Sequence, residues 1–284
     1  MAATKPRVRV TAGGLRGRLE SGVAVFKGIP FAEPPARFAA PGPVEGWDGT
    51  RDALSFGPPP PQSGLLGTDA VTESAGGWLT VNVWTPDPAA SLPVMVWIQG
   101  GGYVFGTSGR PEYDGGRLAR DGGVVVVTLN YRLGIEGFAR IDGAPANRGL
   151  LDQVAALEWV RDNISAFGGD PDQVTVFGQS AGGGSVAALL AMPRAAGLFR
   201  RAIVQSMPIV FVTPELAADV ARVLAAELGL SPAELDTVPP AELPPVPTVL
   251  LAVPPPADEP PVPTVLDDCA KPETAVPARN AAAK

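Results

Sequence analysis

The 284 residues include no histidine and only one cysteine, Cys269. A lone cysteine cannot form an internal disulfide or a Cys-rich zinc site. The lack of histidine excludes His-ligated metals and every mechanism in which an imidazole of this chain acts as the general base. We therefore expect no metal and no other cofactor.

Basic residues are also scarce. Lysine and arginine together number 22 against 29 acidic residues, which gives a net charge of −7. Only four of the basic residues are lysines, and Arg200 and Arg201 form the one adjacent arginine pair. Because nucleic-acid binding requires clustered positive charge, no nucleic-acid partner is expected.

The sequence lacks long apolar runs. The run from Val124 to Val127, with Leu129 beyond Thr128, is far too short to cross a bilayer. The opening segment MAATKPRVRV has no apolar region typical of a signal peptide. These observations predict a soluble, cytoplasmic protein with no membrane span, and they leave the oligomeric state open.

Strands and helices alternate through most of the chain. Apolar alternation or continuous apolar runs predict strands, and recurrence at three and four residues predicts helices. The expected strands are 8–10, 23–26, 79–84, 93–98, 123–129, 173–177 and 202–205, and the expected helices are 151–167, 180–192, about 214–228 and a short one after Ser231. The stretch from Pro30 to Gly67 is rich in proline and glycine and reads as irregular chain. This alternation predicts an α/β fold with a mostly parallel central sheet and helices on both faces.

The composition changes after about Leu243. The seven-residue sequence PPVPTVL occurs at Pro244–Leu250 and again at Pro260–Leu266. Such proline-rich chain favours an extended conformation and buries little apolar surface. We expect one folded domain over 1–243 and a flexible tail over 244–284, with a ligand for proline-recognition modules as the alternative for the tail.

A nucleophile elbow is predicted where the strand at 173–177 meets the following helix. Gly178-Gln179-Ser180-Ala181-Gly182 fits the G-x-S-x-G pattern between a strand and a helix. The flanking glycines permit a tight turn that exposes the serine oxygen. The N–H of Ala181 opens the helix, where partial positive charge favours an oxyanion. The alternative is a chance glycine-rich helix start.

A second glycine cluster follows the strand at 93–98. It reads Gln99-Gly100-Gly101-Gly102-Tyr103. Consecutive glycines after a strand let backbone N–H groups turn toward a developing negative charge. An oxyanion loop explains this position better than a merely flexible turn does.

The segment from Asn147 to Gly184 resembles the type-B carboxylesterases of the α/β-hydrolase fold, which include the cholinesterases. Four further motifs match in order, at 28–35, 78–86, 94–106 and 130–134, so the resemblance covers about residues 8–230. It implies ester hydrolysis through an acyl-enzyme on a small-molecule ester. Ser180 would be the nucleophile, and the N–H groups of Gly101, Gly102 and Ala181 would form the oxyanion hole. Gln179, Tyr103 and Phe105 are the candidate substrate-binding residues; packing in the core is the alternative for the two aromatic residues.

The chain also departs from the family pattern. Gln99 stands where the family usually has histidine, and Gln179 where glutamate is common. The family's ion pair would match Arg37 and Glu73, whereas Asn130, Arg132, Asp152 and Asp170 look structural. The family's catalytic acid and histidine lie well downstream of the elbow, and no acid after Ser180 fits that motif.

These departures leave three hypotheses for the function. Serine needs a base to take its proton, and the four lysines lie before the sheet core or in the tail. The first hypothesis is a C-terminally truncated esterase domain with weak or no turnover. The second is a non-catalytic binding or adhesion module, and the third is an incomplete fragment.

Overall fold

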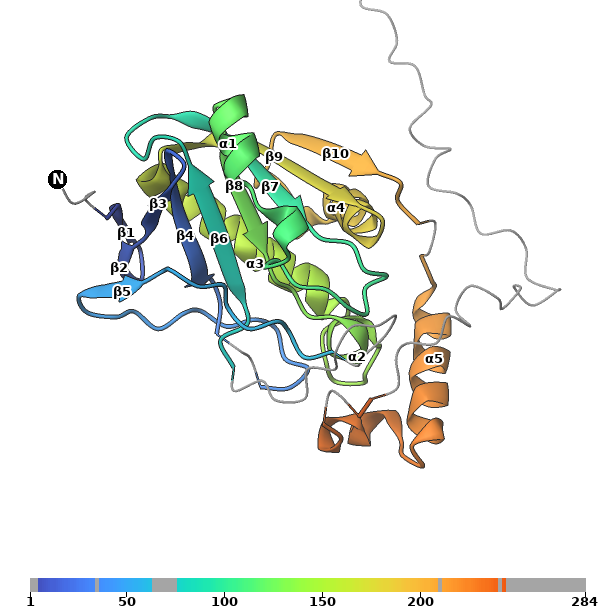
Figure 1. The fold of residues 1–284 in the computed structure, drawn as a ribbon. Helices are drawn as coiled ribbons and strands as arrows, with labels where there is room; N and C mark the ends of the chain where they lie inside the picture. Colours follow the sequence, from blue (N-terminus) through green and yellow to red (C-terminus); the bar gives the residue numbers. More distant parts are fainter. Residues whose placement is uncertain (1–4, 34–35, 63–75, 209–210, 240–241, 244–284) are drawn as a thin grey trace, which may run out of the picture. The chain divides into compact units, whose positions relative to one another are not determined.

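The computed structural model describes residues 5–33, 36–62, 76–208, 211–239 and 242–243. A seven-stranded sheet runs through this part of the chain (Figure 1), with the strand order β10-β9-β7-β8-β6-β4-β3. The predicted tail 244–284 lies outside the described residues. The strands are β3 (Arg18–Glu20), β4 (Val23–Pro30), β6 (Thr80–Thr85), β7 (Leu92–Ile98), β8 (Val125–Leu129), β9 (Gly169–Gln179) and β10 (Arg201–Gln205).

The sheet is parallel in one half and antiparallel in the other. The pairs β10-β9, β9-β7 and β7-β8 are parallel, as the sequence pattern predicts. The pairs β8-β6, β6-β4 and β4-β3 are antiparallel. The parallel strands β7 and β9 end at Ile98 and Gln179, where the two glycine motifs lie.

A small second sheet has the order β1-β2-β5. Its strands are β1 (Arg7–Val10), β2 (Gly13–Arg16) and β5 (Thr50–Asp52). β5 falls inside the stretch expected to be irregular. Its three residues are exposed and carry no apolar pattern, so this strand depends on pairing with β2 and on the ion pair between Arg16 and Asp52.

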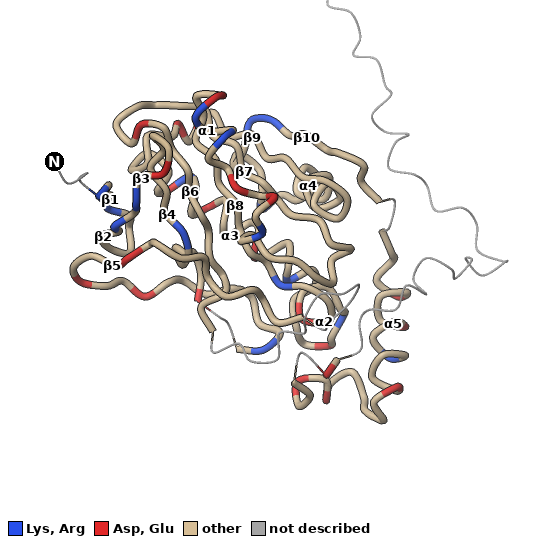
Figure 2. The backbone as a smooth tube through the Cα atoms, in the orientation of Figure 1, with Lys and Arg blue, Asp and Glu red and all other residues tan. Residues whose placement is uncertain are grey.

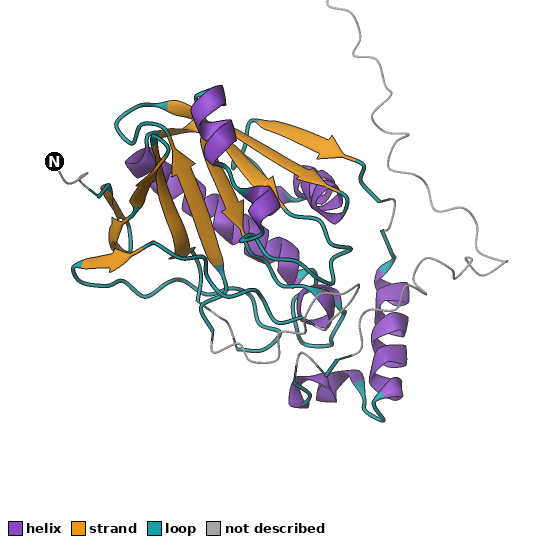
Figure 3. Ribbon diagram, in the orientation of Figure 1, coloured by secondary structure: helices purple, strands orange, loops and turns teal. Residues whose placement is uncertain are grey.

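Helices cover both faces of the large sheet, as expected (Figure 3). α3, α4 and α5 agree with the periodic segments, whereas the five- and seven-residue helices α2 and α1 are too short for periodicity to predict. The α-helices are α1 (Gly116–Gly122), α2 (Gly134–Phe138), α3 (Arg148–Asn163), α4 (Ala181–Ala191) and α5 (Pro214–Glu227). Single 3₁₀ turns are η1 (Pro111–Tyr113), η2 (Ile164–Phe167) and η3 (Pro193–Ala195), and the longer η4 is Pro232–Thr237.

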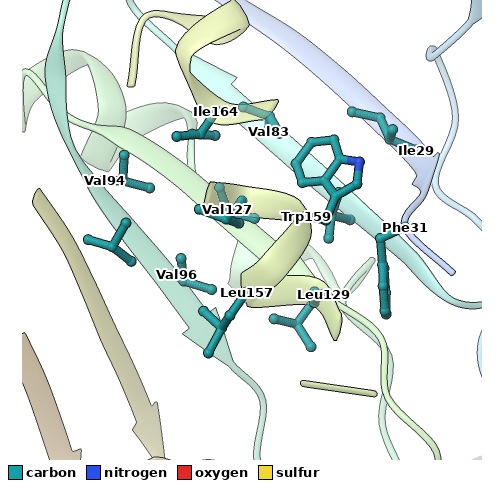
Figure 4. Packing of buried hydrophobic residues seen from close by; sticks show 14 of the residues in the cluster. Ile29, Phe31, Val83, Val94, Val96, Val127, Leu129, Leu157, Trp159 and Ile164 are labelled. Atoms are coloured by element: carbon teal, nitrogen blue, oxygen red, sulfur yellow. The ribbon is translucent and has the colours of Figure 1, made fainter. Parts of the chain in front are cut away.

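Alternate residues of the strands pack against opposite helices. Val83 and Val127 belong to the main core with Leu157 of α3 (Figure 4). Their neighbours Trp84 and Val126 pack on the other face with Ala119 of α1. This alternation follows from the two-residue period of a strand, and it makes the central strands buried on both faces.

A separate apolar cluster holds α5 and η4. Leu224 and Leu235 are fully buried in it together with Ile135 of α2. Both helix starts predicted from the sequence are confirmed: Thr213 accepts a hydrogen bond from the N–H of Leu216 at 3.3 Å, and Ser231 begins a capping box.

The guanidinium of Arg37 lies 2.6 Å from the carboxylate of Glu136. It also donates a 2.7 Å hydrogen bond to the carbonyl oxygen of Asp236 in η4. The partner expected for Arg37, Glu73, lies outside the described residues. Through these contacts, Arg37 connects its own segment to α2 and to η4.

Charged residues are dispersed along the backbone in Figure 2 rather than gathered in one segment. Within the described ranges, each helix is too short or too polar to pass through a bilayer.

Candidate active site

Ser180 occupies the turn between β9 and α4 and has a strained backbone. Its φ is 55° and its ψ is −127°, a conformation that residues other than glycine rarely adopt. Its N–H donates to the carbonyl oxygen of Gln205 at 3.0 Å, and its own carbonyl accepts from the N–H of Gly184 at 2.9 Å. The half-buried side chain is thus held at the end of the parallel strands.

The glycines that flank Ser180 are required by close backbone contacts. A Cβ built on Gly182 would lie 2.1 Å from the carbonyl oxygen of Ile98, and one on Gly178 would lie 2.5 Å from the carbonyl carbon of Gly182. Any side chain would separate α4 from β7 and β9. The sequence pattern predicts an elbow because glycines permit a tight turn at these positions. The close backbone contacts agree with this reason.

The triple-glycine loop follows β7 directly. Gly101 and Gly102 have φ values of 114° and 59°, in the region that favours glycine. The carbonyl of Gly101 accepts hydrogen bonds from the N–H groups of Val104 and Phe105 at 3.0 and 3.2 Å. No described residue accepts a hydrogen bond from the N–H of Gly101 or Gly102.

The loop lies next to the serine. A Cβ built on Gly100 would be 3.3 Å from the Cβ of Ser180 and 2.8 Å from the carbonyl oxygen of Gln179. The parallel pairing of Ile98 with Gly178 accounts for this closeness, because both strands end at the same edge of the sheet. Ala181, as the first residue of α4, has an N–H without an intrahelical partner.

Two of the three candidate substrate-binding residues are aromatic residues of the loop. Tyr103 and Phe105 are half-buried, and the Tyr103 ring lies 4.8 Å from the ring of Phe138. Burial raises the pKa of the Tyr103 phenol, which keeps the hydroxyl protonated at neutral pH. Gln179 is exposed beside Ser180. A Cβ built on Gly184 would lie 2.4 Å from the Tyr103 hydroxyl, so this ring rests on the first turns of α4.

Gln99 is fully buried at the base of the loop. Its backbone carbonyl accepts a 2.7 Å hydrogen bond from the Tyr131 hydroxyl. Neither its side-chain nitrogen nor its side-chain oxygen has a hydrogen-bond partner among the described residues. A buried amide of this kind carries a free-energy cost of about 1–3 kcal/mol for each unpaired group.

Several residues expected to be structural do support the site. Arg132 forms a buried pair with Asp152 at 2.7 Å. The Asn130 amide donates to the carbonyls of Pro58 and Trp78 at 3.1 Å, and its oxygen accepts from the N–H of Ser108 at 2.7 Å. These contacts hold the chain that follows β8.

Asp170, also expected to be structural, has a local role. Its carboxylate accepts a hydrogen bond from the N–H of Asp172 at 2.9 Å.

Sequence reasoning missed four supporting residues. The carbonyl of Gln205 accepts from Ser180, and the hydroxyl of buried Ser185 in α4 accepts from the side chain of Gln153 at 3.1 Å. Tyr131 positions the carbonyl of Gln99. These contacts join segments that are distant in sequence, so no local motif marks them. Across the described ranges, no group of three or more acidic or cysteine side chains is arranged to hold a metal ion.

The sheet, its covering helices and the strained serine after β9 define a protein of the α/β-hydrolase fold. More narrowly, the chain belongs to the carboxylesterase family, whose model matches residues 4–239. It is 50% identical over 235 residues to a para-nitrobenzyl esterase of Bacillus subtilis (strain 168), covering 79% of this chain and 48% of the relative. It is 44% identical to carboxylesterase 3 of Homo sapiens, covering 81% of this chain and 45% of the relative.

Solved structures agree with this assignment. A PNB esterase structure aligns with a TM-score of 0.75 and 48% identity over 83% of this chain and 51% of the other. A carboxylesterase of Geobacillus stearothermophilus aligns with a TM-score of 0.75 and 41% identity over 84% and 52%. The chain thus spans about half the length of the relatives it matches.

Proposed function

We propose that this chain is the nucleophile-bearing part of a carboxylic ester hydrolase. The observation that carries the proposal is Ser180 in its strained turn, with the glycine loop directly beside it. In the proposed reaction the Ser180 oxygen forms a bond to the ester carbonyl carbon and loses its proton to a base. The base gives this proton to the departing alkoxide, which leaves as an alcohol. Water then hydrolyses the acyl-enzyme, which releases the carboxylic acid and restores the Ser180 hydroxyl.

The N–H groups of Gly101, Gly102 and Ala181 form the proposed oxyanion hole. Two of them have no acceptor among the described residues, and the third opens a helix, where the dipole favours negative charge. Preorganised donors of this type contribute about 3–4 kcal/mol each to transition-state stabilisation. Gln179 precedes Ser180 in the turn, and Tyr103 and Phe105 belong to the glycine loop beside it. These three residues are proposed to contact a small-molecule ester.

None of the residues named above supplies the base that takes the proton of Ser180. The sequence has no histidine. The nearby Tyr103 phenol has a raised pKa, so it is a hydrogen-bond donor rather than a base at neutral pH. We therefore expect slow ester hydrolysis, of the order that remains when a serine hydrolase loses its triad, about 10³–10⁴-fold over water.

Chemical rescue tests this proposal. The rate of p-nitrophenyl acetate hydrolysis is measured for the parent chain and for Ser180→Ala across a series of imidazole concentrations. Imidazole also hydrolyses the ester directly, at the same rate in both samples. Subtracting the Ser180→Ala rate from the parent rate therefore gives the rate that depends on Ser180. We expect this difference to be small without imidazole and to rise as imidazole replaces the missing base.

A matched control uses Ser206, which is exposed and also has a positive φ, of 46°. Ser206→Ala should behave as the parent does. Mass analysis of the intact chain after reaction should show an acyl adduct on the parent and none on Ser180→Ala. Equal rates for the parent and Ser180→Ala at every imidazole concentration would refute the role of Ser180.

A further inference from the structure

The side-chain amide of Gln62 binds the far end of the glycine loop that follows β7. Its nitrogen donates to the carbonyl oxygen of Gly106 at 3.0 Å, and its oxygen accepts from the N–H of the same residue at 2.9 Å. The nitrogen also donates to the carbonyl oxygen of Pro60 at 3.0 Å. Gln62 is only 7% exposed, and hydrogen bonds shielded from water in this way are stronger than exposed ones. Both polar atoms of this buried amide are therefore satisfied by backbone groups.

Gly106 is the point at which the loop comes back to its own start. Its φ is 133°, in the region that favours glycine. A Cβ built on it would lie 3.3 Å from the carbonyl oxygen of Gly100 and 3.3 Å from the side-chain nitrogen of Gln99. That nitrogen has no hydrogen-bond partner among the described residues. Of these two buried glutamine side chains beside Gly106, Gln62 is thus the one that forms hydrogen bonds with it.

The hydrogen bond to the N–H of Gly106 fixes the orientation of the preceding peptide group. The N–H and C=O of a trans peptide point in opposite directions, and the described part of the chain has no cis peptide bond. Since the N–H of Gly106 faces Gln62, the carbonyl of Phe105 faces away from it. This carbonyl lies against Gly101, because a Cβ built on Gly101 would collide with the carbonyl oxygen of Phe105. The contact that holds Gly101 therefore depends on Gln62.

Gly101 carries one of the proposed oxyanion donors. Its carbonyl accepts hydrogen bonds from the N–H groups of Val104 and Phe105, so Gly101 is packed against the rest of the loop. A rotation of the Phe105–Gly106 peptide group would remove its contact with Gly101 and let the N–H of Gly101 turn. Oxyanion donors contribute most when they are held in place before the charge develops, and a displacement of about 1 Å can lower a rate about 10²-fold.

We propose that Gln62 is a positioning residue for the oxyanion hole, and that it holds the N–H of Gly101 in place through the Phe105–Gly106 peptide group. The proposal rests on the proposed function of Ser180. In this role Gln62 touches no reacting atom. It lowers the free energy of the negatively charged intermediate and leaves the binding of the ester unchanged, which distinguishes positioning from a general contribution to stability.

The kinetic test replaces Gln62 by methionine, which has a similar length and no amide. Ser180-dependent hydrolysis of p-nitrophenyl acetate is measured at one imidazole concentration over a range of ester concentrations, with Ser180→Ala in the same background as the blank. Because this chemistry is slow, KM equals the dissociation constant of the ester. We expect Gln62→Met to lower kcat about 10- to 100-fold and to change KM by less than about twofold.

The matched control is Gln173→Met, the same chemical change at a half-buried position in β9. It should behave as the parent does, and circular dichroism checks that both variants fold. Gln62→Asn is a second variant, which keeps a polar side chain but is one methylene too short to reach Gly106. It should show the same loss of kcat, and it replaces Gln62→Met if that variant does not fold.

A second measurement needs no turnover. In NMR spectra of the chain labelled with ¹⁵N-glycine, the Gln62 variants should move the amide signals of both Gly101 and Gly106. Gln173→Met should move neither signal. The Gly106 signal reports the lost hydrogen bond, and the Gly101 signal reports whether the loss reaches the oxyanion donor.

The outcomes separate this proposal from the proposed function. A rise in KM with kcat unchanged overturns the positioning role, and so does a Gly101 signal that stays in place while the Gly106 signal moves. Equal effects of Gln62→Met and Gln173→Met on kcat also overturn it. If the parent shows no Ser180-dependent hydrolysis at any imidazole concentration, the proposed function fails, and the two glycine signals alone decide whether Gln62 positions Gly101.

Discussion

The backbone N–H of Ser180 donates a 3.0 Å hydrogen bond to the carbonyl oxygen of Gln205. This bond ties the strained turn of the candidate nucleophile to the edge strand of the sheet. A disturbance of β10 is therefore transmitted to Ser180 through one peptide group. The candidate active site and the end of β10 are thus joined by this hydrogen bond.

The strain at Ser180 predicts a gain in stability when the side chain is removed completely. Ser180→Gly should raise the free energy of unfolding by about 1 kcal/mol, because relief of about 1–3 kcal/mol of strain exceeds the entropic cost of a glycine. Ser180→Ala keeps the Cβ and should leave stability nearly unchanged. Urea denaturation of the three proteins measures this, and a Ser180→Gly variant no more stable than Ser180→Ala would contradict the strain.

Gly182 should tolerate no side chain. A Cβ there would lie 2.1 Å from the carbonyl oxygen of Ile98, so Gly182→Ala should cost at least about 3 kcal/mol by forcing α4 away from the sheet. The control is Gly122→Ala in α1, where a Cβ would make only ordinary contacts, the nearest at 3.6 Å. That change should be neutral or stabilising by up to about 1 kcal/mol. Thermal unfolding distinguishes the two, and equal melting temperatures would refute the contact.

Because the side-chain amide of Gln99 is unpaired, an apolar residue of similar length at this position should give a more stable protein than glutamine does. Gln99→Met removes two unsatisfied buried groups while filling the same space, whereas Gln99→Ala leaves a cavity. We expect Gln99→Met to be at least as stable as the parent and about 2 kcal/mol more stable than Gln99→Ala. Denaturant midpoints give the comparison. A Met variant as unstable as the Ala variant would mean that the amide is hydrogen-bonded.

Arg148 should be among the most sensitive positions in the chain. Its fully buried guanidinium donates to the carbonyls of Glu136, Pro145, Ile135 and Ala139 at 2.8–2.9 Å. Burial lowers its pKa to about 10, so it remains charged at neutral pH.

Arg148→Met should therefore cost about 3–5 kcal/mol by leaving these carbonyls unpaired. Arg148→Lys should not restore the loss, since an ammonium group cannot reach all four acceptors. Arg120→Met on the exposed face of α1 is the control and should change stability by less than about 0.5 kcal/mol. Urea unfolding measures all three, and a mild effect of Arg148→Met would contradict this role.

The raised pKa values of all three tyrosines predict that the folded chain loses stability at high pH. Burial raises the pKa of Tyr103, Tyr113 and Tyr131 above the ordinary value of 10.0. The folded chain therefore holds these protons more tightly than the unfolded chain does, so stability is intact below pH 10 and falls as the pH rises above it. Tyrosinate absorbance and circular dichroism, followed in one alkaline titration, should change together. Tyrosinate forming near pH 10 in a chain that is still folded would contradict the prediction.

The sequence predicts the fold well where periodicity is long. The strands at 93–98 and 123–129 and the helix at 151–167 correspond to β7, β8 and α3 with η2, because continuous burial leaves a clear apolar pattern. β5 and α2 are too short for such a pattern and depend on tertiary contacts. The antiparallel half of the sheet was also not apparent, because strand direction is set by the connections between strands rather than by their composition.

In the candidate site, too, local features could be predicted from the sequence and features that depend on tertiary contacts could not. Gly178 and Gly182 mark the elbow because a steric limit acts between neighbours in sequence, and the structure gives the contacts that impose this limit. Gln205 and Gln153 could not be recognised, because they act across the fold on groups 20 or more residues away. The unpaired state of Gln99 is likewise a property of its surroundings and not of its identity.

Among the described residues, β10 is the last strand of the sheet in chain order, and it lies at the sheet's end. During synthesis, every other strand of this sheet leaves the ribosome before β10 does, so the core against α3 can form first. The hydrogen bond from the N–H of Ser180 to the carbonyl of Gln205 can form only once β10 is present, so the turn that holds the nucleophile is completed last.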